Sequence, residues 1–428
     1  MAETLPQETA TGHARLRVAV LARAVYPLHG YGGLERHVHD LVRHLVRRGV
    51  AVTLVTRPPA AALAVGDREG PAGCSMIWVP YRTFPFAGRR CTTVLDRSTA
   101  YPWFGYRAGR VVARLVADRQ FDLVHGLGAS ALGYALARAR DPAGTVPFVL
   151  NPQGLEEFGG TGRPFGGSRL KRWAYSPLQI AVRSCARAAD RVVATDKALA
   201  PTVREQLRVP AERVCLVPNA VDLEECDRLA DAADGRSARA GLGVPEKEPV
   251  LLSVGRLEEN KGFHVLARAL ARLGSARWRW VLVGSGPYGP SLERLVRRLG
   301  LEARVTFAGR VDARTLHAWY EAATLFVHPT LYEGSSLVTL EAMAHRRAVV
   351  ATTAGGLPDK VQPGVTGWLV EPGRPEALAA AIRDALAGAA PLERMGLAGR
   401  ALAEAQFSWP VVTDQLLAVY RELVGAGR

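Results

Sequence analysis

Two glutamates, Glu333 and Glu341, stand eight residues apart in the second half of the chain, with a turn of small residues beside the first. Gly334, Ser335 and Ser336 allow the backbone to approach a ligand closely. A helix is expected to begin after them, and the free N–H groups of its first turn would bind a phosphate. Glu333 can accept hydrogen bonds from hydroxyl groups, and Glu341, expected about two turns into the helix, can reach a ribose. The pattern favours a nucleotide site over the alternative of two surface helix residues.

Two cations five residues apart, Arg256 and Lys261, follow the apolar run 250–254. In a turn at the carboxyl edge of a sheet, such a pair can clamp a pyrophosphate and neutralise a departing nucleoside diphosphate. Lys261 is one of only five lysines in a chain that otherwise uses arginine, so a coding bias does not explain it. A solvated turn is the alternative interpretation.

The elements that would carry these residues are apolar runs alternating with helical segments, which predicts parallel sheets with crossover helices. In the first half, the run 16–22 leads into a glycine-rich turn at 29–33. A helix over 34–48 follows, because its apolar residues recur along one helical stripe, and Gly49 is its expected C-cap. Further strands are expected at 50–56, 123–125, 146–150 and 191–195.

The same plan restarts in the second half, after a linker expected at 217–222 and the polar stretch 227–243. Two Rossmann-like halves enclose a cleft, and ligands bind at the carboxyl ends of such strands. The fold class predicted is therefore α/β, with two facing Rossmann-like domains and an interdomain cleft. The strands expected in the second half are 250–254, 280–283, 305–308, 325–328 and 348–352.

Composition narrows the class of protein. The 428 residues are 48% apolar and 22% charged, which is typical of a soluble globular protein and excludes a largely disordered chain. There is no run of about 18 apolar residues and no secretory signal, and the five cysteines are odd in number and widely spaced. A cytoplasmic protein with reduced cysteines is expected.

The formal charge of +15 is concentrated in the first half, where residues 1–215 carry 30 Lys and Arg against 16 Asp and Glu. Such a field suggests an anionic partner, although a coding bias toward arginine is an equal alternative. In the segment 78–106, aromatic residues are interspersed with arginines. This pattern indicates either an insertion with its own small core or a loop that binds the acceptor or lies at a membrane interface. Peripheral contact with the inner face of an anionic membrane is a separate hypothesis, based on Arg169, Lys171, Arg172, Trp173, Tyr175, Arg183, Arg187 and Arg191.

Taken together, these residues resemble the retaining glycosyltransferases of family 4, which have the GT-B architecture. The resemblance spans nearly the whole chain, and six motifs occur in the family's order. They are G-G-L-E-R-H-V at 32–38, V-P-N-A-V-D at 217–222, G-R-L-x-x-x-K-G at 255–262, the two glutamates at 333 and 341, G-W-L-V at 367–370 and F-S-W at 407–409.

The resemblance implies a role for each matching residue. Arg256 and Lys261 would hold the diphosphate, Glu333 the donor sugar and Glu341 the ribose, while His125 would face the transferring sugar. Gly33 would let the first domain close over the phosphates. The donor site implied comprises Gly32, Gly33, Gly255, Gly284, Arg310, Gly334, Ser335, Ser336, Leu337, Val338 and Glu341, with backbone N–H groups of Leu337 and Val338 on the phosphates.

The chain departs from the family pattern at three places. His125 is followed by Gly126-Leu127-Gly128 where many members have a second histidine, and Asn151-Pro152-Gln153-Gly154 replaces a frequent His-Gly pair. Gln153 is expected to substitute for that histidine, with Glu156 or Glu157 contacting the acceptor hydroxyl. The usual small-Pro-Glu after a glycine pair is replaced by Leu357-Pro358-Asp359, with Lys360 next, near the expected sugar pocket.

The function expected is transfer of a hexose from a UDP- or GDP-sugar to a glycan or lipid-linked acceptor, with retained configuration. Domains are expected at 1–216, for the acceptor, and 217–409, for the donor, with a helix at about 410–428 returning to the first. The chain contains no D-x-D, so no metal or other cofactor is expected beyond the nucleotide-sugar co-substrate. The main alternative is a non-hydrolysing nucleotide-sugar epimerase. An NAD-dependent dehydrogenase is disfavoured because this chain has no G-x-G-x-x-G after its first strand, and a nucleic-acid-binding protein is disfavoured because the chain has no recognition motif for nucleic acid.

Overall fold

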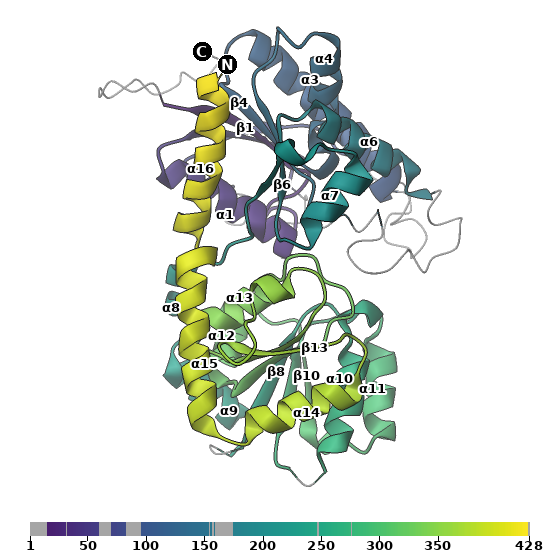
Figure 1. The fold of residues 1–428 in the computed structure, drawn as a ribbon, viewed down its shortest axis with the longest axis vertical. Coiled ribbons are helices and arrows are strands. Elements are labelled where there is room, and N and C mark those ends of the chain that lie inside the picture. Colours follow the sequence, from purple (N-terminus) through teal and green to yellow (C-terminus); the bar gives the residue numbers. More distant parts are fainter. Residues whose placement is uncertain are drawn as a thin grey trace.

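The computed structural model describes residues 15–30, 32–59, 70–82, 96–153, 155, 158, 174–245, 248–274 and 276–426. Its first half forms one wholly parallel sheet (Figure 1). In spatial order the strands are β3 (Ser75–Trp78), β2 (Ala51–Thr56), β1 (Arg17–Leu21), β4 (Leu123–Leu127), β5 (Phe148–Asn151), β6 (Arg191–Ala194) and β7 (Val214–Leu216).

The second half forms another parallel sheet with the same kind of order. Its strands are β10 (Val305–Gly309), β9 (Arg279–Val283), β8 (Val250–Val254), β11 (Leu325–His328), β12 (Val349–Thr352) and β13 (Gly367–Val370). In both sheets the first strands are added on one side of the starting strand, β1 or β8, and the later strands are then added on its other side. The expected α/β class, with two Rossmann-like domains, is confirmed, and ligand sites are expected where the strand order reverses, beside β1 and β4 and beside β8 and β11.

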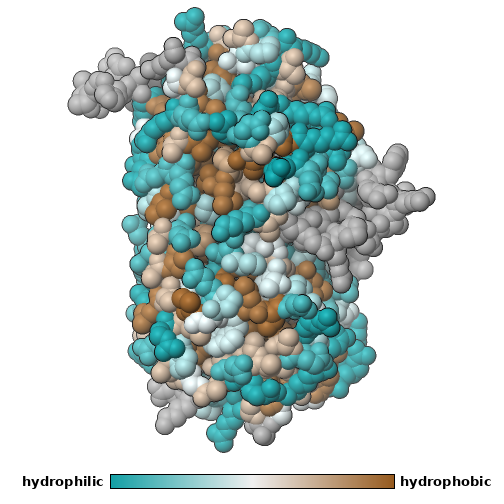
Figure 2. All heavy atoms as spheres, in the orientation of Figure 1, coloured by the Kyte–Doolittle hydropathy of each residue, from teal (hydrophilic) through white to brown (hydrophobic). Residues whose placement is uncertain are grey.

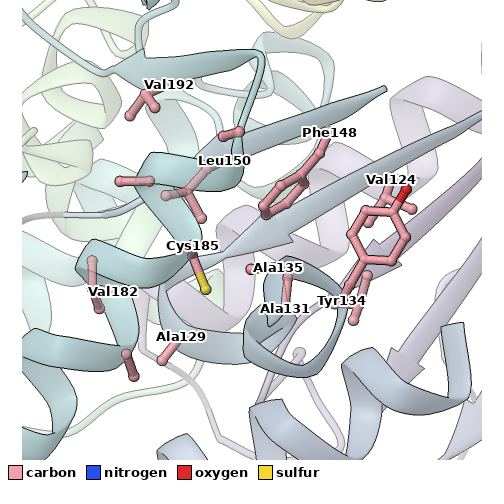
Figure 3. Close-up of a cluster of buried hydrophobic side chains, with 14 of the residues drawn as sticks. Val124, Ala129, Ala131, Tyr134, Ala135, Phe148, Leu150, Val182, Cys185 and Val192 are labelled. Carbon is pink, nitrogen blue, oxygen red and sulfur yellow. The ribbon is translucent and has the colours of Figure 1, made fainter. Parts of the chain in front are cut away.

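Helices cover both faces of the first sheet. They are α1 (Gly33–Arg47), α3 (Tyr101–Ala117), α4 (Leu132–Arg140), α6 (Ser176–Ala188) and α7 (Leu199–Leu207). The apolar stripe of α1, which includes Val38, Leu41 and Leu45, is buried on one face. On the other face Tyr134 of α4 meets Phe148 of β5 edge-on at 5.6 Å, while Val182 and Cys185 of α6 lie beside them (Figure 3). Alternate strand residues therefore supply two separate cores.

The second sheet is also covered by helices on both faces. They are α8 (Leu223–Leu229), α9 (Ala232–Gly241), α10 (Phe263–Leu270), α11 (Gly289–Arg298), α12 (Ala313–Ala322), α13 (Leu337–Ala344), α14 (Pro375–Leu386) and α15 (Ala389–Leu402). The polar stretch 227–243, beside which the linker was expected, is mostly helical. Asp222 caps α8 by accepting from the Glu225 N–H at 3.0 Å, and Asp231 and Asp234 form a capping box on α9. The polar residues are cap residues rather than linker residues.

The last helix, α16 (Trp409–Ala426), leaves the second domain and lies along the first (Figure 1). Its buried face, with Trp409, Leu416 and Tyr420 among others, completes the core between α1 and the first sheet. An ion pair of 2.7 Å joins Arg48 to Asp414, and another joins Arg191 to Glu422. The helix therefore ties the second domain to the first through apolar burial as well as charge.

Hydrophilic side chains are interspersed with hydrophobic ones over the face of the molecule in Figure 2. Within the described ranges, no helix combines the length and the apolar character needed to cross a bilayer.

Acid should weaken the docking of α16, because two neutral histidines are buried under it. His37 lies 5.5 Å from the Trp409 ring, and burial lowers its pKa to about 4; burial, followed by the neighbouring His37, lowers the pKa of His125 to about 3. Below the unfolded pKa of about 6.5, the unfolded chain binds protons that the folded chain does not. The contribution of the two buried neutral histidines to the free energy of unfolding is therefore fully present above pH 6.5 and is lost as the pH falls toward 4. At pH 5 the loss is about 2 kcal/mol per histidine.

Thermal unfolding measured between pH 8 and pH 5 tests this expectation. The midpoint of the wild type should fall more steeply below pH 6.5 than that of His37→Leu, while the two should change in parallel between pH 7 and pH 8. Parallel behaviour over the whole range would contradict the assignment of the acid sensitivity to His37.

Candidate active site

A buried carboxylate lies at the centre of the second domain's carboxyl edge. Glu333, which follows β11, accepts hydrogen bonds from Lys261 Nζ at 2.9 Å and from His328 Nε2 at 2.7 Å, both on its Oε2 atom. Burial alone would raise the pKa of Glu333, but the charge of Lys261 and the hydrogen bond from His328 hold it well below its usual range. Glu333 is therefore an ionised hydrogen-bond acceptor next to an ammonium group, as a residue binding sugar hydroxyls would need to be.

Close backbone contact fixes this pair. Gly262, directly after Lys261, has φ +69°, and a Cβ there would lie 2.0 Å from the carbonyl oxygen of Pro329. The Leu331 N–H donates to the Asn260 carbonyl at 2.8 Å across the same junction. The loop that carries Lys261 is thus pressed against the loop that leads to Glu333, and only glycine permits the approach.

The helix expected between the two glutamates is α13, and Ser336 is its N-cap, whose Oγ accepts from the Thr339 N–H at 3.3 Å. The helix begins at Leu337, so the N–H groups of Leu337 and Val338 belong to its first turn, where helical partners are lacking. Gly33, at the start of α1, faces this turn across the cleft, because a Cβ on Gly33 would lie 3.3 Å from Leu337 Cδ1. Gly32 caps the same end of α1. The two domains therefore meet where the phosphates are expected.

Glu341 lies just over one turn into α13, not the two turns expected. Its Oε2 accepts from the Tyr320 hydroxyl at 2.8 Å, and burial raises the pKa of Glu341. With Arg36 of the first domain, Glu341 also lines a cavity of about 40 Å³. It is thus a wall residue of the cleft, shared with the N-terminal domain.

Lys360 is a residue of this site whose importance the sequence analysis missed. It is completely buried, and its Nζ donates to Ser335 Oγ at 3.0 Å and to the Gly356 carbonyl at 3.3 Å. Burial lowers the pKa of Lys360, while the charges of Asp196, Asp359 and Glu333 oppose that shift. The signal was available, because Lys360, like Lys261, is a rare lysine in an arginine-rich chain.

The glycine pair before Lys360 joins this group to the other domain. A Cβ on Gly355, where φ is +55°, would lie 1.9 Å from the Glu333 carbonyl oxygen, and one on Gly356 would lie 2.7 Å from Asp196 Cβ of the first domain. The Lys197 N–H donates to Asp359 at 2.7 Å nearby. The backbone of the loop with Gly355 and Gly356 therefore packs between Glu333 and the N-terminal domain.

Four other residues expected to bind the donor, Gly255, Arg256, Gly284 and Arg310, follow the ends of strands β8, β9 and β10. Arg256 is 77% exposed at its side chain and pairs with Glu258 at 2.6 Å. A Cβ on Gly284, where φ is +139°, would lie 1.9 Å from the carbonyl oxygen of Gly255, so these glycines bring two loops together. Arg310 follows β10 and is exposed.

The structure does not bring His125 to the donor cluster. It is 1% exposed, lies on the face of β4 covered by α16, and its Nδ1 is 2.5 Å from the Tyr420 hydroxyl. Leu127, the next residue whose side chain lies on the same face of β4, ends the strand and lines a pocket. The histidine therefore takes part in docking α16, and its position gives no support to contact with a sugar.

A pocket of about 180 Å³ opens at the carboxyl ends of β1, β4 and β5 in the first domain. Arg23, Arg97, Tyr101 and Gln153 line it, and the Arg23 guanidinium lies over the Tyr101 ring at 4.9 Å. Gln153 has φ +68°, and its Nε2 is buried without a hydrogen-bond partner. Leu34, next to Gly33, also lines the pocket, so the pocket adjoins the contact between Gly33 and α13. Glu156 and Glu157 lie outside the described residues.

Much of the expected lipid-facing surface also lies outside the described residues, namely Arg169, Lys171, Arg172 and Trp173. Arg183 donates to the Gln206 carbonyl at 2.8 Å, and Arg191 pairs with Glu422. Of the aromatic segment, residues 83–95 are not described, whereas Phe104 is a core residue and Trp103 is 58% exposed. Membrane contact stays a prediction.

Both halves of the chain match known protein families. Residues 31–225 match the family described as Glycosyltransferase Family 4, and residues 248–388 match Glycosyl transferases group 1. The chain is 31% identical to an alpha-maltose-1-phosphate synthase of Mycobacterium tuberculosis, over 95% of this chain and 100% of that one.

Two solved structures show the same fold. Sucrose-phosphate synthase from Thermosynechococcus elongatus has a TM-score of 0.75 and 26% identity, covering 96% of this chain and 100% of that chain. Anabaena Alr3699/HepE in complex with UDP-glucose has a TM-score of 0.71 and 22% identity, with the same coverage.

Replacing Gly33 by valine should push α1 away from α13. The added methyl groups would meet Leu337, which already leaves only 3.3 Å for a Cβ. We expect UDP or GDP affinity, measured by calorimetry, to fall about tenfold with little change in the thermal midpoint. Gly241→Ala is the matched control, because nothing lies within 4 Å of a Cβ there. Equal affinities in the two variants would show that the contact does not shape the site.

Proposed function

The chain belongs to the group 1 and family 4 glycosyltransferases, which have the GT-B fold, and we propose that it moves a hexose from a UDP- or GDP-sugar to an acceptor hydroxyl with retained configuration. The observation that supports this best is the group of Lys261, His328 and Glu333 beside the start of α13. It offers a carboxylate for sugar hydroxyls, a cation for phosphate and a helix N-terminus within one short stretch of surface.

In the proposed donor complex, the diphosphate lies at the first turn of α13 and draws Lys261 from Glu333. Arg256, on its exposed turn, folds over the same phosphates, and Glu341 accepts from the ribose hydroxyls. Glu333, released from one partner but still held by His328, accepts from hydroxyls of the sugar. The positive charges and the helix dipole favour the departing diphosphate, so we expect no metal ion to be needed.

The proposed transfer takes place on one face of the sugar. The bond between the anomeric carbon and the phosphate oxygen breaks, and both of its electrons leave with the nucleoside diphosphate. The acceptor oxygen then forms its bond to the anomeric carbon on that same face. The acceptor proton passes to the departing phosphate oxygen, so neither a protein nucleophile nor a separate base is required.

The acceptor we propose is a phosphorylated sugar or polyol, bound in the N-terminal pocket. Arg23 and Arg97 give that pocket two guanidinium groups, and the unpartnered Gln153 amide offers a further donor. The relatives named above include two whose names contain a phosphorylated sugar. A lipid-linked phosphate shares this chemistry, and a place in glycan or envelope synthesis stays a prediction. The epimerase alternative finds no support among the relatives.

Donor chemistry can be tested without knowing the acceptor. Purified protein is incubated with UDP-, GDP- and ADP-sugars, and slow release of nucleotide is measured. Glu333→Gln and Lys261→Met should each lower release from the preferred donor by about 10²–10³, the loss typical of a group that stabilises a transition state.

Glu302→Gln is the control for Glu333, because Glu302 is exposed and precedes β10, at the amino edge of the sheet opposite the site. It should keep the wild-type rate. Release that is equal in all four proteins would contradict the donor site, and the absence of both release and nucleotide binding would contradict the proposed function.

The acceptor pocket has its own test. Arg23→Gln should raise KM for a phosphorylated sugar acceptor about 10- to 100-fold, the loss expected for a charge-assisted hydrogen bond, and should leave donor hydrolysis unchanged. Arg110→Gln, on the exposed side of α3, is the control. If the wild-type enzyme has the same KM for the acceptor with and without its phosphate, the pocket does not bind phosphate.

A further inference from the structure

Three potential metal ligands from separate elements meet in the interior of the second domain. Cys226 comes from α8, His317 from α12, and His345 caps the end of α13. All three are buried, and one ligand atom from each lies within 4.8 Å of the others. None of the roles assigned to the donor site uses them.

The hydrogen bonds of His345 fix which of its nitrogens faces the cluster. Its Nδ1 lies 2.6 Å from Glu321 Oε1, while the other oxygen of Glu321 accepts from Arg347 at 2.9 Å. Because Glu321 is ion-paired with Arg347, its carboxylate accepts hydrogen bonds and donates none. Nδ1 therefore carries the proton, and Nε2 presents its lone pair. A carboxylate behind the second ring nitrogen is the usual outer partner of a metal-bound histidine.

His317 completes a pair of facing imidazoles. Its Nδ1 lies 2.7 Å from His345 Nε2, so a proton joins the two rings. In a tetrahedral zinc site, with Zn–N distances of about 2.0–2.1 Å, the two nitrogens would lie roughly 3.4 Å apart. A shift of roughly 0.7 Å in one ring then replaces the shared proton with a metal ion.

The surroundings leave space for a fourth ligand. Cys226 and His317 line the cavity of about 40 Å³ that Glu341 also borders, enough for one water molecule. Asp222 and Glu225 line it as well, but Arg43 pairs with Asp222 and Arg36 with Glu225, so these charges add little net attraction for a cation. The fourth position thus opens toward the residue that would hold the donor's ribose.

We propose that Cys226, His317 and His345 bind one zinc ion, with the fourth position open to the cavity beside Glu341. One thiolate and two imidazoles are a zinc-type ligand set. On binding, the Cys226 thiol releases its proton to solvent and the sulfur takes the metal. The proton that joins the two rings moves to His317 Nε2, so that each ring binds the metal through an unprotonated nitrogen. The ion would join α8, α12 and α13 behind the donor site, and it takes no part in the transfer itself.

Cobalt, whose visible spectrum reports its ligands, is the probe. The full chain is stripped of metal, checked for the absence of bound zinc, and titrated with Co²⁺. We expect one ion per chain, with a thiolate-to-cobalt charge-transfer band that disappears when Zn²⁺ is added. Cys226→Ser should abolish the band, whereas Cys215→Ser, a half-buried cysteine of the first domain, should retain it.

His345→Gln guards against a folding defect in the cysteine variant, since it keeps the thiol and should weaken cobalt binding at least tenfold. Circular dichroism checks that each variant is folded. No charge-transfer band in the wild type would show that the three groups form only a hydrogen-bonded chain, and a band that survives in Cys226→Ser would place the thiolate elsewhere; either result overturns the proposal. Because the readout is spectroscopic, it is independent of nucleotide release and of the proposed function.

Discussion

The burial of one ionised carboxylate constrains most of the second domain's ligand edge. A charge removed from water is costly unless hydrogen bonds and an opposite charge replace the solvent. Glu333 meets this condition with Lys261 from one loop and His328 from its own strand. Those donors reach it only because Gly262 and Gly355 let the neighbouring loops approach to backbone contact. The hydrogen bonds and the ion pair that stabilise the Glu333 carboxylate therefore constrain the positions of three loops. The same loops carry the groups assigned to the donor.

The relation between the two domains has a similar origin in buried polar groups. Asp222, just before α8, takes hydrogen bonds from Arg43 and His44 of α1, which oppose the effect of its burial and hold the pKa of the Asp222 carboxyl well below its usual range. On the adjoining side, α16 returns and buries Trp409 against the rings of His37 and His44. Helix α1 thus binds both the start and the end of the second domain, and its own first residue, Gly33, faces α13. One helix positions the cleft from three directions.

The sequence predicted what depends on local pattern. The bounds of buried central strands such as β8 and β11 were predicted correctly, because all their positions except Ser253 and His328 are apolar. The strands β3 and β7 were missed, since as edge strands they are only partly buried and lack that pattern. Glu333 and Lys261 were found from spacing, but no spacing shows that they pair. The role of His125 came from the family resemblance alone, and no local pattern shows that Tyr420 of α16, nearly 300 residues later, covers this histidine.

The three cations assigned to the proposed donor site, Lys261, Arg256 and Lys360, are each paired with groups of the protein, and this would affect how a donor binds. Lys261 is held by Glu333, Arg256 by Glu258, and Lys360 by Ser335 and the carboxylates around it. A diphosphate therefore meets the N–H groups of α13 as its first uncommitted donors, and each cation must exchange a carboxylate for a phosphate oxygen. That exchange changes Glu333 most, because it loses a charged partner while staying buried. Sugar hydroxyls that donate to Glu333 replace part of the lost interaction, so the phosphates and the sugar must bind together. The paired charges thus predict that nucleotide and sugar bind cooperatively.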